Sequence, residues 1–122
     1  MSSVKELIVW NRAYDLTLKV YTSTKLFPKD EQFNLTSQIR RSVVSIPSNI
    51  AEGHARKGKK EFSQFLYIAF GSCSELETQL LIAKDLKYLK EKDFLELSSL
   101  LTEVMKMLSS LISKINYQTC IN

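Results

Sequence analysis

Glycine, proline, cysteine and histidine are all scarce in this chain. Its 122 residues include 3 Gly, 2 Pro, 2 Cys and 1 His. So few glycines and prolines favour long regular elements over loops. The chain has no HExxH or ExxH pattern and no Cys/His cluster, so we expect no zinc or di-iron site. It also lacks the GxxxxGK loop that cradles phosphates, and we expect no cofactor.

Long apolar runs are missing as well. No segment approaches the roughly 20 uninterrupted apolar residues of a membrane span. The apolar stretch near the start is too short and carries charge too early for a secretory signal. We therefore expect a cytoplasmic protein that does not enter a membrane. The two cysteines are interpreted as a reduced core thiol at Cys73 and a thiol in a frayed tail at Cys120.

The size and composition suit one globular domain over residues 1–122. Hydrophobic residues make up 44% of the chain and charged residues 25%, both ordinary values for a globular protein. A domain of this length can bury enough surface to fold without a disulfide or a structural metal.

Apolar residues recur at helical spacing in four segments. The third segment has the stripe Phe62, Leu66, Ala69, Cys73, Leu76, Leu80 and Ala83, and the fourth has the seam Phe94, Leu97, Leu101, Val104, Leu108, Leu111 and Ile115. The spacing predicts helices over about residues 6–26, 31–52 or a few residues beyond, 59–87 and 93–115. No Asn-Gly or Asp-Gly turn and no sustained alternation of period two indicates strands. Four amphipathic helices with short links predict an all-α, antiparallel, up-down-up-down four-helix bundle.

The helix predicted over residues 6–26 has a wide apolar face made of two parallel rows. One row consists of Leu7, Trp10, Tyr14, Leu18 and Tyr21, and the other of Val9, Ala13, Leu16 and Val20.

The helix predicted over residues 31–52 has two separate apolar faces. The core stripe consists of Ile39, Val43, Ile46 and Ile50. The second face is made of the small residues Val44, Pro47 and Ala51, with Arg40 at its edge. Two apolar faces usually mean burial on two sides, and the second side can be covered by another helix of the same chain or by another protomer. Because the helix over residues 6–26 also has a wide apolar face, we expect a homo-oligomer whose interface both helices form.

Three residues of the predicted helices break the pattern of good helix formers. Pro47 costs roughly 3 kcal/mol inside a helix, yet the periodicity continues through it, which predicts a kinked but unbroken helix. We expect Asn49 to bond to a backbone group that Pro47 frees. Gly53 is expected to end its helix, and Gly71 to permit close backbone approach.

Positive charge is concentrated in residues 37–60, which hold 6 basic side chains and 1 acidic one. Such a segment is a candidate footprint for a polyanion. The candidate nucleic-acid-binding residues are Arg40, Arg41, Arg56, Lys57, Lys59 and Lys60. Since no aromatic residue is interleaved with these cations, recognition would be mostly independent of sequence.

Structural roles compete with phosphate binding at each of these positions. Arg40 and Arg41 can pair instead with carboxylates such as Glu75 or Glu77. Arg56 lies four residues after Glu52 and can pair with it along the helix. Alternatively, the stretch "ARKGKK" is only a solvated link between two helices and has no binding role.

Three stretches together resemble a known family. They are "LIVWNRAYDL" at 7–16, "LFPKDEQFNLTSQIRRSVVSIPSNIAEGHAR" at 26–56 and "EFSQFLYIAFGSCSELETQL" at 61–80. The chain resembles the bacterial four-helix bundle family, also called the 23S rRNA intervening-sequence protein family, over roughly residues 5–115.

The resemblance implies a four-helix bundle that assembles as a ring-like homopentamer. The family is similar to the accessory protein of diversity-generating retroelements, a basic pentamer that binds nucleic acid and a reverse transcriptase. No catalytic residues are established for the family.

Two functions from different classes are therefore expected. The first is a non-enzymatic homo-oligomer that binds RNA or DNA through basic surface contacts. The alternative is an oligomeric scaffold that docks a protein partner such as a reverse transcriptase. An enzyme is not expected, because no acid–base or metal constellation is visible in the sequence.

Overall fold

The computed structural model describes residues 3–121, with side chains through residue 118, and four long helices dominate it. They are α1 (Ile8–Thr24), α2 (Leu35–Ala55), α3 (Lys59–Asp85) and α4 (Glu91–Ile121). Two short 3-10 turns, η1 (Val4–Glu6) and η2 (Lys29–Glu31), precede α1 and α2. No strand occurs in this part of the chain.

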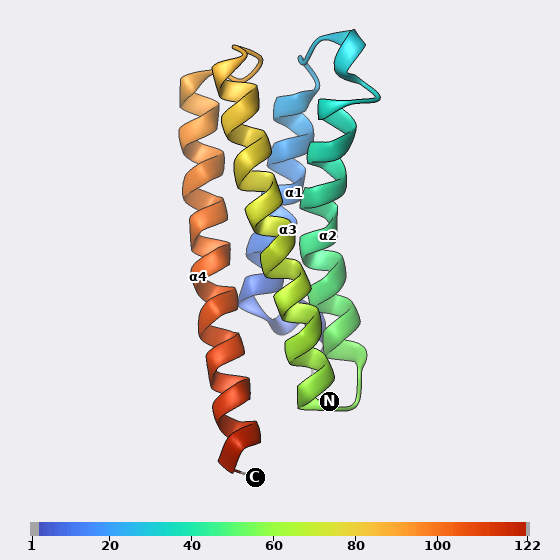
Figure 1. Cartoon of the computed structure of the whole chain (residues 1–122), viewed down its shortest axis with the longest axis vertical. Helices are drawn as coiled ribbons and strands as arrows, with labels where there is room; N and C mark the ends of the chain where they lie inside the picture. The colour runs from blue at the N-terminus through green and yellow to red at the C-terminus, as the bar shows by residue number, and fades with distance from the viewer. Residues whose placement is uncertain (1–2, 122) are drawn as a thin grey trace.

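The helices form an antiparallel bundle in which each helix packs against its two neighbours (Figure 1). Short links place α1 beside α2, α2 beside α3 and α3 beside α4, and α4 closes the bundle against α1. The predicted all-α fold class is confirmed. None of the helices within residues 3–121 is long and apolar enough to cross a membrane.

The core lies where the apolar stripes of α2, α3 and α4 were predicted. All four stripe residues of α2 are 0% exposed, and the α4 seam is buried at Leu97, Leu101, Val104 and Leu108. On α1 only one of the two predicted rows is buried, namely Val9, Ala13, Leu16 and Val20. The other row lies toward the outside, and Tyr14, Leu18 and Tyr21 are exposed.

The predicted helix boundaries differ most from the structure at the starts of α1 and α2 and at the end of α4. The residues expected to open α1 and α2 form the separate turns η1 and η2, so these helices begin at Ile8 and Leu35. Before α2 the backbone of Asn34 leaves the helical region, and the Glu31 carboxylate accepts a hydrogen bond from the Leu35 amide at 3.3 Å. At the other end of the chain α4 runs on to Ile121, well past the expected end at residue 115.

Helix α2 continues unbroken through Pro47, as the periodicity predicts. Proline has no N–H, so the carbonyl of Val43 loses its usual helical donor. Thr17 of α1 compensates in part, because its single hydroxyl proton is shared between the Val43 carbonyl at 3.3 Å and the nearer Ala13 carbonyl at 2.8 Å. The prediction for Asn49 was wrong in its partner: Asn49 Nδ2 donates to the Ser45 carbonyl at 2.8 Å, not to the group that Pro47 frees.

Neither of the two glycines inside helices has its predicted role. Gly53 does not end α2, which continues to Ala55. It is buried, and a Cβ there would lie 2.7 Å from Phe65 Cβ, so Gly53 is where α2 and α3 approach closely. Gly71 is exposed, and a Cβ there would meet nothing within 4 Å.

Cys73 is a buried thiol of the core, as expected. Burial raises its pKa to about 12, with a further contribution from the Glu77 charge, so the thiol stays protonated and unreactive. The side chain of Cys120 lies outside the described residues.

Candidate nucleic-acid interface

The basic segment lies where α2 turns into α3, at one end of the bundle (Figure 1). Arg56 and Gly58 both have extended backbone conformations there, which carry the chain from one helix into the next. Lys57, Lys59 and Lys60 are exposed, and none of them forms an ion pair within residues 3–121. The carboxylates of the same segment, Glu52 and Glu61, pair with Arg56 and not with these three lysines.

Two further lysines lie at the same end of the bundle. Lys5 belongs to η1, which packs against α2. Lys114 lies near the end of α4, two residues before Asn116, whose Oδ1 accepts a hydrogen bond from Ser63 of α3 at 2.9 Å. We call this surface, made of Lys5, Lys57, Lys59, Lys60 and Lys114, the basic end.

The first turn of α3 adds backbone donors to the basic end. Its N-cap residue is Gly58, which provides no side-chain cap, and the space beside it is open. The first amides of a helix have no partner within the helix and carry a partial positive charge. Lys59 and Lys60 therefore flank a position that favours a phosphate group.

Arg56 is largely engaged within its own chain. It pairs with Glu52 at 3.0 Å, which confirms the predicted i,i+4 pair, and with Glu61 at 3.6 Å. Its guanidinium also lies 5.1 Å from the centre of the Phe65 ring. Arg56 therefore holds the link between α2 and α3 and has less charge to offer a ligand than its lysine neighbours.

The six predicted residues do not form one patch. Arg41 and Arg56 are 15 residues apart on one helix, a separation of about 22 Å at 1.5 Å per residue. Arg41 is exposed and forms no ion pair with any described residue. It therefore belongs to the opposite half of the bundle from the basic end.

Arg40 has neither of the carboxylate partners considered from the sequence. Its Nε donates to Thr24 Oγ1 at 2.9 Å and its Nη2 to the Tyr21 carbonyl at 3.3 Å. The guanidinium also lies 4.6 Å from the centre of the Tyr21 ring. Arg40 thus binds the carboxyl end of α1, where a cation is favourable to the helix dipole.

An aromatic residue near the basic end was missed in the sequence. Lys60, Gln64 and Tyr67 are spaced by four and three residues along α3, and all three are exposed. The Tyr67 hydroxyl accepts a hydrogen bond from Asn116 Nδ2 at 3.2 Å, which orients the ring between α3 and α4. The spacing of Lys60, Gln64 and Tyr67 is visible in the sequence. It places the Tyr67 ring, on which a base can stack, near the lysines of the basic end.

The predicted interface residues of α2 differ in exposure. Pro47 is buried by its own chain, while Val44 is 38% exposed and Ala51 half-buried. Pro47 therefore offers little surface to a sister subunit, contrary to the expectation. The outer row of α1 lies on the same side, because Tyr21 and Val44 line one groove.

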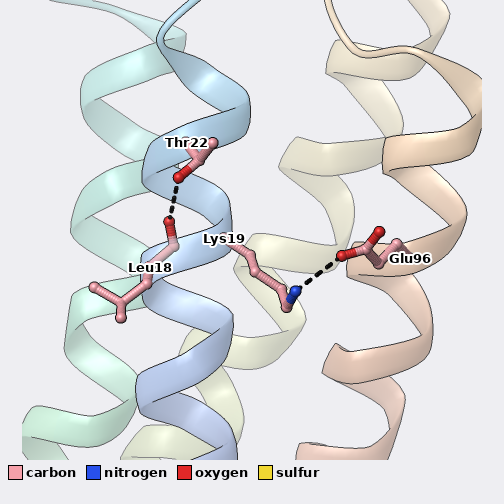
Figure 2. Close-up of polar contacts among 4 residues, drawn as sticks. All are labelled: Leu18, Lys19, Thr22 and Glu96. Atoms are coloured by element: carbon pink, nitrogen blue, oxygen red, sulfur yellow. Dashed lines mark hydrogen bonds and ion pairs between the residues drawn. The ribbon is translucent and has the colours of Figure 1, made fainter.

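Figure 2 shows the Leu18 side chain of the outer row and the neighbouring Lys19, which reaches toward α4. Lys19 pairs with Glu96 at 3.1 Å across the edge between α1 and α4, whereas the Leu18 side chain points away from that pair. Trp10 and Tyr14 stack on the same helix with ring centres 5.1 Å apart. We call the surface made of Trp10, Tyr14, Leu18, Tyr21, Val44 and Ala51 the α1–α2 face.

The part of the chain that the structure describes has no group of three or more His, Cys, Asp or Glu side chains placed to hold a metal ion. The only histidine, His54, lies edge-on to Phe62 with ring centres 5.8 Å apart, as in ordinary packing.

Comparisons with known proteins agree with the resemblance seen in the sequence. The family model of the 23S rRNA-intervening sequence protein matches residues 5–110, whereas no curated protein matches the chain. The structure is similar to the crystal structure of a protein of unknown function from the S23 ribosomal protein family of Bacteroides thetaiotaomicron. The two share 24% identity with a TM-score of 0.81, over 87% of this chain and 96% of that one, and a likeness at this identity establishes the fold alone. Because the family model spans most of the chain, this protein belongs to the 23S rRNA-intervening sequence protein family.

Proposed function

We propose that this protein is a non-enzymatic homo-oligomer that binds RNA or DNA through phosphate contacts at the basic end. The observation that carries the proposal is the set of three exposed lysines, Lys57, Lys59 and Lys60, without ion pairs in the described chain and beside the uncapped start of α3. Cations and free helix amides both favour phosphate oxygens.

Binding of this kind depends on salt, because each neutralised phosphate releases condensed counterions. Retention of a labelled single-stranded RNA is measured across a series of salt concentrations. We expect the logarithm of the binding constant to fall linearly with the logarithm of the salt concentration, with a slope of about −0.7 for each phosphate contacted. A purified protein that retains no RNA at low salt would instead favour the alternative, an oligomeric scaffold for an acidic protein surface such as that of a reverse transcriptase.

The homo-oligomer is proposed from the α1–α2 face. Exposed aromatic and aliphatic side chains gather there beside the small residues of α2, and large apolar patches of this kind usually mark an interface. The family resemblance suggests a ring of five copies. Repetition of the basic end around a ring would multiply the number of phosphates bound by one assembly.

A charge placed on the α1–α2 face is expected to break the assembly. Val44→Lys adds a third cation beside Arg40 and Arg41. The new ammonium group would lose its hydration when the subunits associate, which costs free energy. We expect this variant to sediment as a monomer at micromolar concentration, where the wild type sediments as an oligomer. The matched control is Leu95→Lys, since Leu95 is 58% exposed on the outside of α4. A monomeric wild type, or equal dissociation of the two variants, would contradict the proposed interface.

A further inference from the structure

A second cationic site lies at the opposite end of the bundle from the basic end. A pocket of about 250 Å³ is formed by the end of α1, the segment that follows it and the start of α2. Lys25, Lys29 and Arg40 line it, and no carboxylate does. None of the three cations forms an ion pair within residues 3–121.

The nearest acidic residues in the sequence are directed elsewhere. Glu31 follows Lys29 by two residues, but its carboxylate accepts hydrogen bonds from the Leu35 amide at 3.3 Å and from the Tyr88 hydroxyl at 3.0 Å. Asp30 is exposed and does not line the pocket. The pocket therefore keeps a net positive charge.

The end of α1 would by itself repel an anion, because its last carbonyls carry partial negative charge. Three of these carbonyls already accept hydrogen bonds. Arg40 Nη2 donates to Tyr21 at 3.3 Å, the Lys25 amide to Thr22 at 3.3 Å, and the Phe27 amide to Thr24 at 3.1 Å. The lysine ammonium groups and the Gln32 amide of the pocket remain as donors to a ligand.

A buried hydroxyl on the pocket wall supports a ligand independently of the charges. Thr36 lines the pocket and is only 6% exposed, yet its Oγ1 has no hydrogen-bond partner among the described residues. Nearly all buried hydroxyls in folded proteins have a partner, and one without a partner calls for an explanation. The oxygen itself is shielded from solvent, so an oxyanion in the pocket would accept this hydrogen bond after the Thr36 side chain turns toward it.

The surroundings of the pocket indicate what the oxyanion is attached to. Its volume lies below the roughly 300 Å³ at which pockets for drug-sized ligands begin, so it suits a phosphoryl group and little more. A neighbouring groove of about 640 Å³ shares Gln32, Thr36 and Arg40 with the pocket. That groove is also lined by Phe33, which is 86% exposed, and such a ring can stack on a nucleobase.

We propose that this pocket binds the phosphate monoester of a nucleotide, with the nucleoside lying against Phe33 at the end of the neighbouring groove next to the pocket, beyond Tyr21 and Val44 of the α1–α2 face. The ligand is either a free nucleoside monophosphate or the phosphorylated 5′ end of an RNA strand, since both present the same dianion. The site uses none of the lysines of the basic end, so it does not depend on the function proposed above.

The test is calorimetric titration of the assembled protein, in which the α1–α2 face takes up Tyr21 and Val44 while the pocket and Phe33 remain for the ligand. The probes are adenosine 5′-monophosphate, adenosine, and a short RNA with either a 5′-phosphate or a 5′-hydroxyl. We expect the phosphorylated member of at least one pair to bind at least tenfold more tightly, since hydrogen bonds to a charged group are the strong ones. A preference confined to the RNA pair would identify the strand end as the ligand. Equal binding within both pairs would overturn the proposal.

Variants separate this pocket from general positive charge. Lys25→Ala with Lys29→Ala is expected to remove the tenfold preference, while Lys90→Ala with Lys92→Ala, which changes the net charge equally, leaves it. Thr36→Val keeps the shape of the side chain and removes the hydroxyl. We expect it to weaken binding of the phosphorylated probe severalfold without lowering thermal stability. An unchanged preference in the Lys25/Lys29 variant would reject the site even if the phosphorylated probe binds.

Discussion

Replacing Lys57, Lys59 and Lys60 together by alanine is expected to weaken RNA retention roughly 100-fold at 50 mM salt. Each lysine that contacts a phosphate contributes about 0.7 to the slope of the logarithmic salt dependence for a single strand, so loss of three lowers the slope by about 2. The effect is expected to be largest at low salt, because the lost contribution is electrostatic. It is measured by filter retention of labelled RNA with the wild type and the variant side by side.

The fold is not expected to change in this variant. Lys57 lies in the link, Lys59 and Lys60 lie in the first turn of α3, and alanine is a good helix former. The control replaces Lys90, Lys92 and Lys106, which are also exposed and without ion pairs in the described chain, and lowers the net charge by the same amount. If both triple variants lose affinity and slope equally, then RNA responds to the overall charge and the basic end is not the binding site.

The fold could be predicted from the sequence where one apolar stripe dominates a helix. The stripe from Ile39 to Ile50 and the α4 seam are buried as expected, because a single period near 3.6 leaves one orientation that covers the apolar side chains. On α1 two adjacent rows were apolar, and periodicity could not choose between them. The row with Val9 and Leu16 is in the core, whereas the row with Tyr14 and Tyr21 keeps its hydroxyl groups near solvent, as tyrosine commonly does.

The candidate site was predicted less well, because it depends on neighbours that the sequence does not identify. The separation of Arg41 from Arg56 follows from the helix rise alone and could have been foreseen. The partners of Arg40 could not, since Tyr21 and Thr24 meet it only through the packing of α1 on α2. The proposed phosphate pocket was missed for the same reason. Lys25 and Lys29 lie in the link between α1 and α2, and hydrophobic periodicity does not predict the path of a link.

Gly53→Ala is expected to lower the free energy of unfolding by about 1–2 kcal/mol, and Gly71→Ala to raise it by up to about 1 kcal/mol. Alanine favours a helix interior by roughly 1 kcal/mol over glycine at both positions. At Gly71 nothing lies within 4 Å of the new methyl group, so that gain is kept. At Gly53 the methyl group would lie 2.7 Å from Phe65 Cβ and 3.0 Å from Phe62 Cδ1, and overpacking typically costs 1–3 kcal/mol. The measurement is equilibrium denaturation at one fixed protein concentration, since assembly contributes to stability.

The new Cβ at position 53 and the Cβ of Phe65 are both fixed by the backbone, and this decides how the clash between them can be relieved. Phe62 can move its ring by rotation, but the Cβ of Phe65 stays in place in every residue except glycine. Phe65→Ala should therefore not rescue Gly53→Ala, and the two losses of stability should add in a double-mutant cycle. Rescue by Phe65→Ala would mean that the glycine accommodates the aromatic ring instead of the approach of two helix backbones. In that case a rotamer change of Phe65 alone would relieve the contact between α2 and α3. The position of the link at Arg56–Gly58 would then not depend on Gly53.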